Sequence, residues 1–148
     1  MVTEEEIIRF MSALPGVFTQ TAQTADGSPE IACGDTFFFH EPDRKMPFAT
    51  IVTKDYPGWD TASYLDRPGV FRVNAAVGRE RFAQLLGYPP AAHAEHAGEY
   101  DYTALDRLVP HPVYAAQGWV SILNPSGDTV RPVLVAAHER AGQRHGSG

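Results

Sequence analysis

The sequence has little cysteine, little lysine and no long apolar run, and each shortage excludes a class of protein. A single cysteine, Cys33, cannot form an intrachain disulfide, so the chain is not a disulfide-stapled secreted scaffold. Its apolar runs span only a few residues, far short of the roughly 20 that a membrane-spanning helix needs. The acidic N-terminal stretch is unlike a basic signal peptide. We therefore expect a cytoplasmic protein with no membrane partner.

Positive charge is also scarce, because 12 Lys and Arg stand against 18 Asp and Glu, for a formal net charge of −6. Nucleic-acid binding needs clustered cations that displace counterions from phosphates, and the basic residues here are scattered along the chain. This distribution argues against nucleic acid as a partner. The P-loop, GxGxxG and HExxH motifs are absent, so those routes to nucleotide or zinc binding have no support.

What is present is an ordinary globular composition. A chain of 148 residues with 43% hydrophobic residues matches one domain, and it needs no cofactor in order to fold. We place that domain at residues 1–142 and expect 143–148 to be a frayed tail. Apolar periodicity predicts helices near 3–14, 79–86 and from 128 onward, with partly helical structure in 91–109. It predicts strands over 17–25, 30–33, 36–40, 48–53, 70–74 and 119–123.

The order of these elements predicts the fold class. Strands and helices do not alternate regularly, so a doubly wound parallel sheet is not expected. A run of strands framed by helices favours an α+β domain, in which a single antiparallel sheet carries its helices on one face.

The loop at 54–60 is the first candidate binding segment. It joins predicted core strands, yet it carries Lys54, Asp55, Trp59 and Asp60, and long loops with such residues often form binding surfaces. Trp59 would stack on a flat ligand, and either carboxylate would accept its protons. The alternative is a packed surface loop in which Trp59 covers the sheet edge.

A second group of candidates comes from the predicted strands and from one proline-flanked loop. Arg72 and Asn74 alternate with apolar residues along a predicted strand, so their side chains share the sheet face opposite the apolar one. There they would line a polar pocket; the alternative is simple exposure to solvent. His111 lies between two prolines that hold it in place, and it is the catalytic candidate for acid–base work. The alternative is a structural histidine. Tyr114 and Trp119 follow it as ligand-binding candidates, although Trp119 also suits a core position.

The one metal-like cluster is formed by His93, His96 and Glu99. On a helix these three residues share a face, and two imidazoles with a carboxylate can hold a divalent metal with one position open. The alternative is an exposed polar helix in an alanine-rich region.

Three stretches carry a resemblance to a known family: 46–52 (MPFATIV), 65–74 (LDRPGVFRVN) and 118–125 (GWVSILNP). Together they resemble an actinobacterial family of unknown function over nearly the whole chain. More remotely, the layout is similar to the MmcQ/YjbR-like superfamily, which implies a double-wing, frataxin-like α+β fold. That superfamily is often labelled DNA-binding, whereas the acidic balance of this chain points away from nucleic acid.

These observations favour a small bacterial domain that binds a small molecule or peptide in a cleft. The walls of the cleft would be the strand with Arg72 and Asn74, the 54–60 loop and the segment from His111 to Trp119. The alternatives are a metal-assisted enzyme that uses the His/His/Glu cluster, and nucleic-acid binding through the wings. The sequence predicts neither the ligand nor an oligomeric state.

Overall fold

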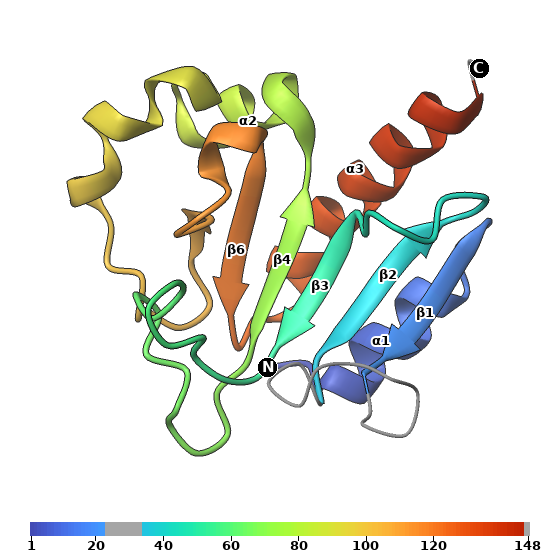
Figure 1. Cartoon of the computed structure of the whole chain (residues 1–148), viewed down its shortest axis with the longest axis horizontal. Coiled ribbons are helices and arrows are strands. Elements are labelled where there is room, and N and C mark those ends of the chain that lie inside the picture. The colour runs from blue at the N-terminus through green and yellow to red at the C-terminus, as the bar shows by residue number, and fades with distance from the viewer. Residues whose placement is uncertain (23–33, 147–148) are drawn as a thin grey trace.

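The computed structural model describes residues 1–22 and 34–146, which form one antiparallel six-stranded sheet with its helices (Figure 1). The turn predicted at 26–29, the strand predicted at 30–33 and Cys33 lie outside the described residues. The α+β class with a single antiparallel sheet is confirmed. In the described part of the chain, no helix has the length and apolarity needed to cross a membrane.

The strands lie in the order β1-β2-β3-β4-β6-β5, and every neighbouring pair is antiparallel. Their bounds are β1 (Val17–Thr21), β2 (Thr36–His40), β3 (Ala49–Val52), β4 (Arg72–Ala76), β5 (Leu108–Pro110) and β6 (Trp119–Leu123). The first four strands follow one another along the chain in the sheet, and the pairing of β4 with β6 then joins two strands that are separated by α2 (Gly78–Leu86), the first two 3-10 helices and β5. Strand β5 was not predicted. It consists of three residues, too few to show an alternating pattern.

Three α-helices pack against the sheet. In Figure 1, α1 (Glu4–Ser12) and α3 (Gly127–Gly146) lie behind the strands, and α2 (Gly78–Leu86) lies at the upper ends of β4 and β6. Their apolar side chains form one buried cluster with the inward residues of the strands, exemplified by Met11, Phe82 and Leu134 packed with Ile51 and Val73. Helix α1 begins with the predicted capping box. Helix α3 continues to Gly146, through most of the segment that we expected to fray.

Three short 3-10 helices lie in connections of the described chain: η3 (Pro90–Glu95) and η4 (Ala97–Glu99) between α2 and β5, and η5 (Ala115–Gln117) between β5 and β6. Because side chains alternate along a strand, the residues that face away from the α-helices point to the other face of the sheet. The loop between β3 and β4 lies beside the lower end of β6 in Figure 1, and its residues Tyr56, Trp59 and Asp60 line a cavity together with side chains of that second face. The candidate site lies between this loop and the sheet.

Candidate functional site

A cavity of about 730 Å³ lies on the face of the sheet that points away from the buried core, with Arg140 and Ala141 of α3 at its border, and we call it the sheet cavity. Its lining is mostly apolar and draws on three segments that the sequence had singled out: the strand β4, the 54–60 loop and the stretch from His111 to Trp119. The volume falls within the range typical of small-molecule sites. The aromatic rings in its lining are Phe37, Phe48, Tyr56, Trp59, Tyr114 and Trp119.

The register of three strands sets a row of polar side chains across this face. Thr50 of β3 lies opposite Asn74 of β4, which lies opposite Ser121 of β6. Asn74 Nδ2 donates to Thr50 Oγ1 at 3.0 Å, and Ser121 Oγ donates to Asn74 Oδ1 at 2.7 Å. Asn74 and Ser121 are buried. A buried polar row with its partners in place orients each group and avoids the cost of unpaired burial.

Arg72 adds a buried charge to this row. Its guanidinium forms a two-pronged ion pair with Asp60, with Nη1–Oδ1 at 3.0 Å and Nη2–Oδ2 at 2.5 Å. It also donates to Asn74 Oδ1 through Nε at 2.8 Å and to Ser63 Oγ through Nη1 at 2.8 Å. The Arg72 side chain is 1% exposed and that of Asp60 is 6% exposed. The pair therefore fixes the end of the 54–60 loop against the sheet at the floor of the sheet cavity.

A second buried carboxylate holds the start of the same loop. Asp35 is fully buried, and its Oδ1 accepts hydrogen bonds from the backbone N–H of Thr53 at 3.0 Å and from Thr53 Oγ1 at 3.2 Å. The Tyr56 hydroxyl donates to Asp35 Oδ2. Burial, together with this hydrogen bond, raises the pKa of Tyr56, so the phenol keeps its proton and remains a donor. The loop is thus anchored at Tyr56 and at Asp60.

His111 is held in one tautomer by the backbone. Its Nδ1 accepts hydrogen bonds from the N–H groups of Val113 at 2.9 Å and Tyr114 at 3.0 Å, so Nδ1 carries the lone pair and the neutral ring has its proton on Nε2. Burial, followed by the positive charge of Arg72, lowers the pKa of His111 to about 3. The imidazole is therefore neutral at physiological pH and acts through Nε2 as a hydrogen-bond donor.

The donor atom of His111 has no hydrogen-bond partner among the described residues. In the described residues, no fully buried side-chain nitrogen or oxygen lacks a hydrogen-bond partner. The hydrogen bonds of His111 are both made by Nδ1, so Nε2 must keep contact with open space, although the residue is only 4% exposed. His111 lines the sheet cavity, so we infer that Nε2 presents its N–H to that space.

Aromatic rings form the outer wall. Trp59 contacts Tyr56 edge to face with ring centroids 5.4 Å apart, and it contacts Tyr114 in the same way at 5.7 Å. Tyr114 in turn lies 5.0 Å from the His111 ring and 6.4 Å from Trp119. Trp59 is 53% exposed, so this chain of rings extends from the floor to the mouth of the sheet cavity.

The structure brings most of the predicted binding residues together. Trp59, Asp60, Arg72, Asn74, Tyr114 and Trp119 all line the sheet cavity, as does the catalytic candidate His111. Lys54 and Asp55 are not part of the lining. Asp55 instead closes the loop, because its Oδ1 accepts from the backbone N–H of Leu65 at 2.8 Å.

The predicted metal cluster is not assembled as a metal centre. Within the described ranges, no group of three His, Cys, Asp or Glu side chains is placed to hold a metal ion. His96 Nδ1 pairs with Glu99 Oε2 at 2.8 Å, and its ring stacks on Tyr88 at 3.9 Å. His93 turns its Nδ1 toward the Tyr88 hydroxyl at 3.3 Å. The aromatic ring of Tyr88 thus engages both imidazoles, and the sequence pattern could not reveal this neighbour.

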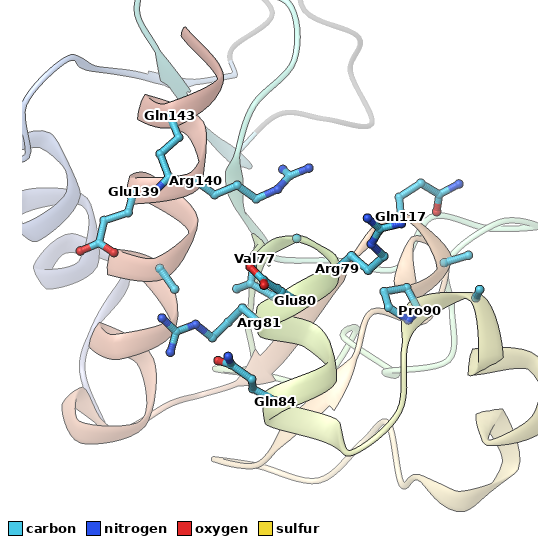
Figure 2. A pocket seen from close by; sticks show the side chains of 15 residues that line it. Val77, Arg79, Glu80, Arg81, Gln84, Pro90, Gln117, Glu139, Arg140 and Gln143 are labelled. Atoms are coloured by element: carbon cyan, nitrogen blue, oxygen red, sulfur yellow. The ribbon is translucent and has the colours of Figure 1, made fainter. Parts of the chain in front are cut away.

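A second cleft, of about 810 Å³, lies between α2 and α3 near η5 (Figure 2). It is larger than the sheet cavity, but its charged side chains do not converge. Figure 2 shows the guanidinium of Arg81 directed toward α3, that of Arg79 lying near Gln117, and that of Arg140 on a separate side. Arg79 and Arg81 are exposed. An open cleft with divergent charges is a weaker candidate than a buried polar floor.

The sequence did not identify several residues that shape the sheet cavity. Thr50, Ser63 and Ser121 hold its floor through the hydrogen bonds described above. The alternation of β3 and β6 carried a signal for two of them, because Thr50 and Ser121 are the polar residues between apolar neighbours on those strands. Ser63 lies in an irregular loop, where no periodic pattern exists.

Taken together, the fold and the site define a single-sheet α+β domain with a deep cavity on the open face of the sheet. The chain matches the family described as a family of unknown function (DUF6194) over residues 2–147, and it belongs to that family. No curated protein matches the chain, and no solved structure does.

Proposed function

We propose that this protein binds a small molecule in the sheet cavity. One observation carries the proposal: a buried side chain, His111, presents an N–H without a partner among the described residues at the floor of a mostly apolar cavity. A cavity that pairs apolar walls with a few placed polar groups is the usual form of a ligand site.

The buried ion pair gives the site a rigid frame. Burying Arg72 and Asp60 costs desolvation free energy, and their geometry with Asn74 and Ser63 offsets that cost. The same contacts hold the 54–60 loop in place, so the aromatic wall is formed before a ligand arrives. Preorganised walls lower the entropy cost of binding.

Two expectations from the sequence remain proposals beside this one. We place the protein in the cytoplasm, on its composition. We also retain the MmcQ/YjbR-like relationship as a proposal about the fold, supported by the order of its elements. The net charge of −6 continues to argue against a nucleic-acid partner.

A thermal-shift screen of metabolites tests the proposal, because a ligand that binds only the folded state raises the melting temperature. The two tryptophans of the chain, Trp59 and Trp119, both line the sheet cavity. Their indole fluorescence and indole N–H resonances therefore report whether a stabilising compound binds there. We expect hits that perturb both tryptophans.

A cavity-filling variant supplies the control. Val52→Phe places a large ring in the lining of the sheet cavity without removing a side-chain hydrogen bond, and Val70→Phe makes the same change at a half-buried valine outside that lining. We expect Val52→Phe to abolish the response to every hit, and Val70→Phe to retain it. Hits that act equally on both variants, or a screen without hits, would refute the proposed function.

A further inference from the structure

We infer that the ligand of the sheet cavity is an uncharged, planar molecule whose carbonyl or equivalent acceptor atom takes a hydrogen bond from His111 Nε2. This inference rests on the proposed function and specifies its ligand class. It draws on three properties of the described lining: its hydrogen-bonding capacity, its charge balance and its shape.

The floor of the cavity offers hydrogen-bond donors rather than acceptors. His111 donates through Nε2, since its other nitrogen accepts from two backbone N–H groups. Thr50 Oγ1 accepts from Asn74, which leaves its own hydrogen for another acceptor. The acceptors nearby are engaged: Asn74 Oδ1 takes bonds from Arg72 and Ser121. A ligand that meets this floor must therefore supply an acceptor.

The formal charges of the lining cancel. Apart from histidines, the charged residues around the sheet cavity are two carboxylates, Asp43 and Asp60, and two guanidiniums, Arg72 and Arg140. Asp60 already satisfies Arg72 with a two-pronged ion pair. A ligand with a net charge would bring an uncompensated charge into an apolar space, and such a transfer is costly.

The wall favours a flat ligand. Tyr56, Trp59 and Tyr114 form a continuous series of edge-to-face ring contacts along one side. The ring faces and edges of such side chains pack well against planar aromatic systems. A neutral imidazole in this tautomer can also polarise the carbonyl that it contacts, although binding alone requires only the hydrogen bond.

Three probes that share a phenyl ring and differ in head group test the ligand class. Benzamide is neutral and has a carbonyl acceptor, benzoate is its anionic counterpart, and benzylamine is a cation without an acceptor. Titrations would follow the indole N–H resonances of Trp59 and Trp119 in nitrogen-15 spectra. We expect benzamide to bind about tenfold more tightly than either charged probe. Benzoate would bring a charge that nothing in the lining compensates, and benzylamine would lack the hydrogen bond from His111; either loss is worth about this factor.

A pair of variants separates the donor of His111 from its structural role. In His111→Asn, the side-chain oxygen occupies the place of Nδ1 and still accepts from the backbone, but the ring Nε2 is gone. In His111→Gln, the amide nitrogen reaches toward the position of Nε2, and the backbone acceptor is lost. We expect His111→Asn to fold with near-normal stability and to lose benzamide binding about tenfold, and His111→Gln to retain part of the binding.

The outcomes distinguish the inference from the proposed function. Benzoate or benzylamine binding as tightly as benzamide, or full benzamide binding by a folded His111→Asn, would overturn the ligand class. If none of the three probes shifts the indole resonances while a screened metabolite does, the ligand class is wrong and the proposed function stands. If no probe and no metabolite shifts them, both are wrong.

Discussion

Removing the carboxylate of Asp60 is the sharpest test of the buried network. Asp60→Asn keeps the shape of the side chain but leaves the guanidinium of Arg72 buried without its counter-charge. Breaking a buried ion pair from one side costs about 3–5 kcal/mol. For a domain of this size the loss corresponds to a fall in melting temperature of about 6–20 °C. Urea unfolding at neutral pH, read by tryptophan fluorescence, measures the change in the free energy of unfolding.

Two further variants control for this result. Glu41→Gln breaks the exposed ion pair with Arg44, which has the same 2.5 Å separation, and we expect little change because solvent screens that pair. The double variant Asp60→Leu with Arg72→Met removes both buried charges, and we expect it to be more stable than Asp60→Asn. If Asp60→Asn costs no more than Glu41→Gln, the pair does not support the floor of the sheet cavity and the reasoning fails.

Three other changes test separate parts of the account. Folding lowers the pKa of His111 to about 3, so neutral His111 contributes fully to stability above its unfolded pKa of about 6.5, and this contribution declines as the pH falls from 6.5 toward 3. At pH 5 the loss in the free energy of unfolding is at most about 2 kcal/mol. His111→Asn should flatten this pH dependence, which urea titrations at pH 7 and pH 5 would measure. Tyr56→Phe removes the hydrogen bond to the buried carboxylate of Asp35 and should lower the free energy of unfolding by about 1.5–3 kcal/mol; an unchanged urea midpoint would contradict that anchor. Gly118→Ala should destabilise the fold by about 1–3 kcal/mol, because φ is +86° there and the new Cβ would lie 3.1 Å from the backbone of Gly78; a melting temperature equal to that of the unmodified protein would contradict this packing.

The sequence predicted the sheet well because its strands have strong local signals. The run of aromatic residues in β2 and the apolar residues of β6 matched the observed strands at both ends. Strand β4 was placed two residues too early, because Val70 and Phe71 are as apolar as the residues that pair. The short strand β5 depends on its pairing with β6, and no local pattern reveals it.

The candidate site could be predicted where strand alternation applied. Arg72 and Asn74 were placed on a shared face by their spacing, and the structure shows that face as the floor of the sheet cavity. Their partners came from irregular loops and from distant strands, so only the tertiary fold could identify Asp60 and Ser121 as their hydrogen-bond partners. The tautomer of His111 likewise follows from backbone N–H groups whose directions the sequence does not encode.

The imidazole of His111 provides the most direct test of the central claim, that the sheet cavity presents a fixed hydrogen-bond donor to a ligand. A long-range nitrogen-15 spectrum of the histidine side chains near pH 6 distinguishes the two neutral tautomers from the imidazolium. We predict a neutral His111 with its proton on Nε2, and a shift of that resonance when benzamide is added. A protonated ring, or a neutral ring with its proton on Nδ1, would contradict the account.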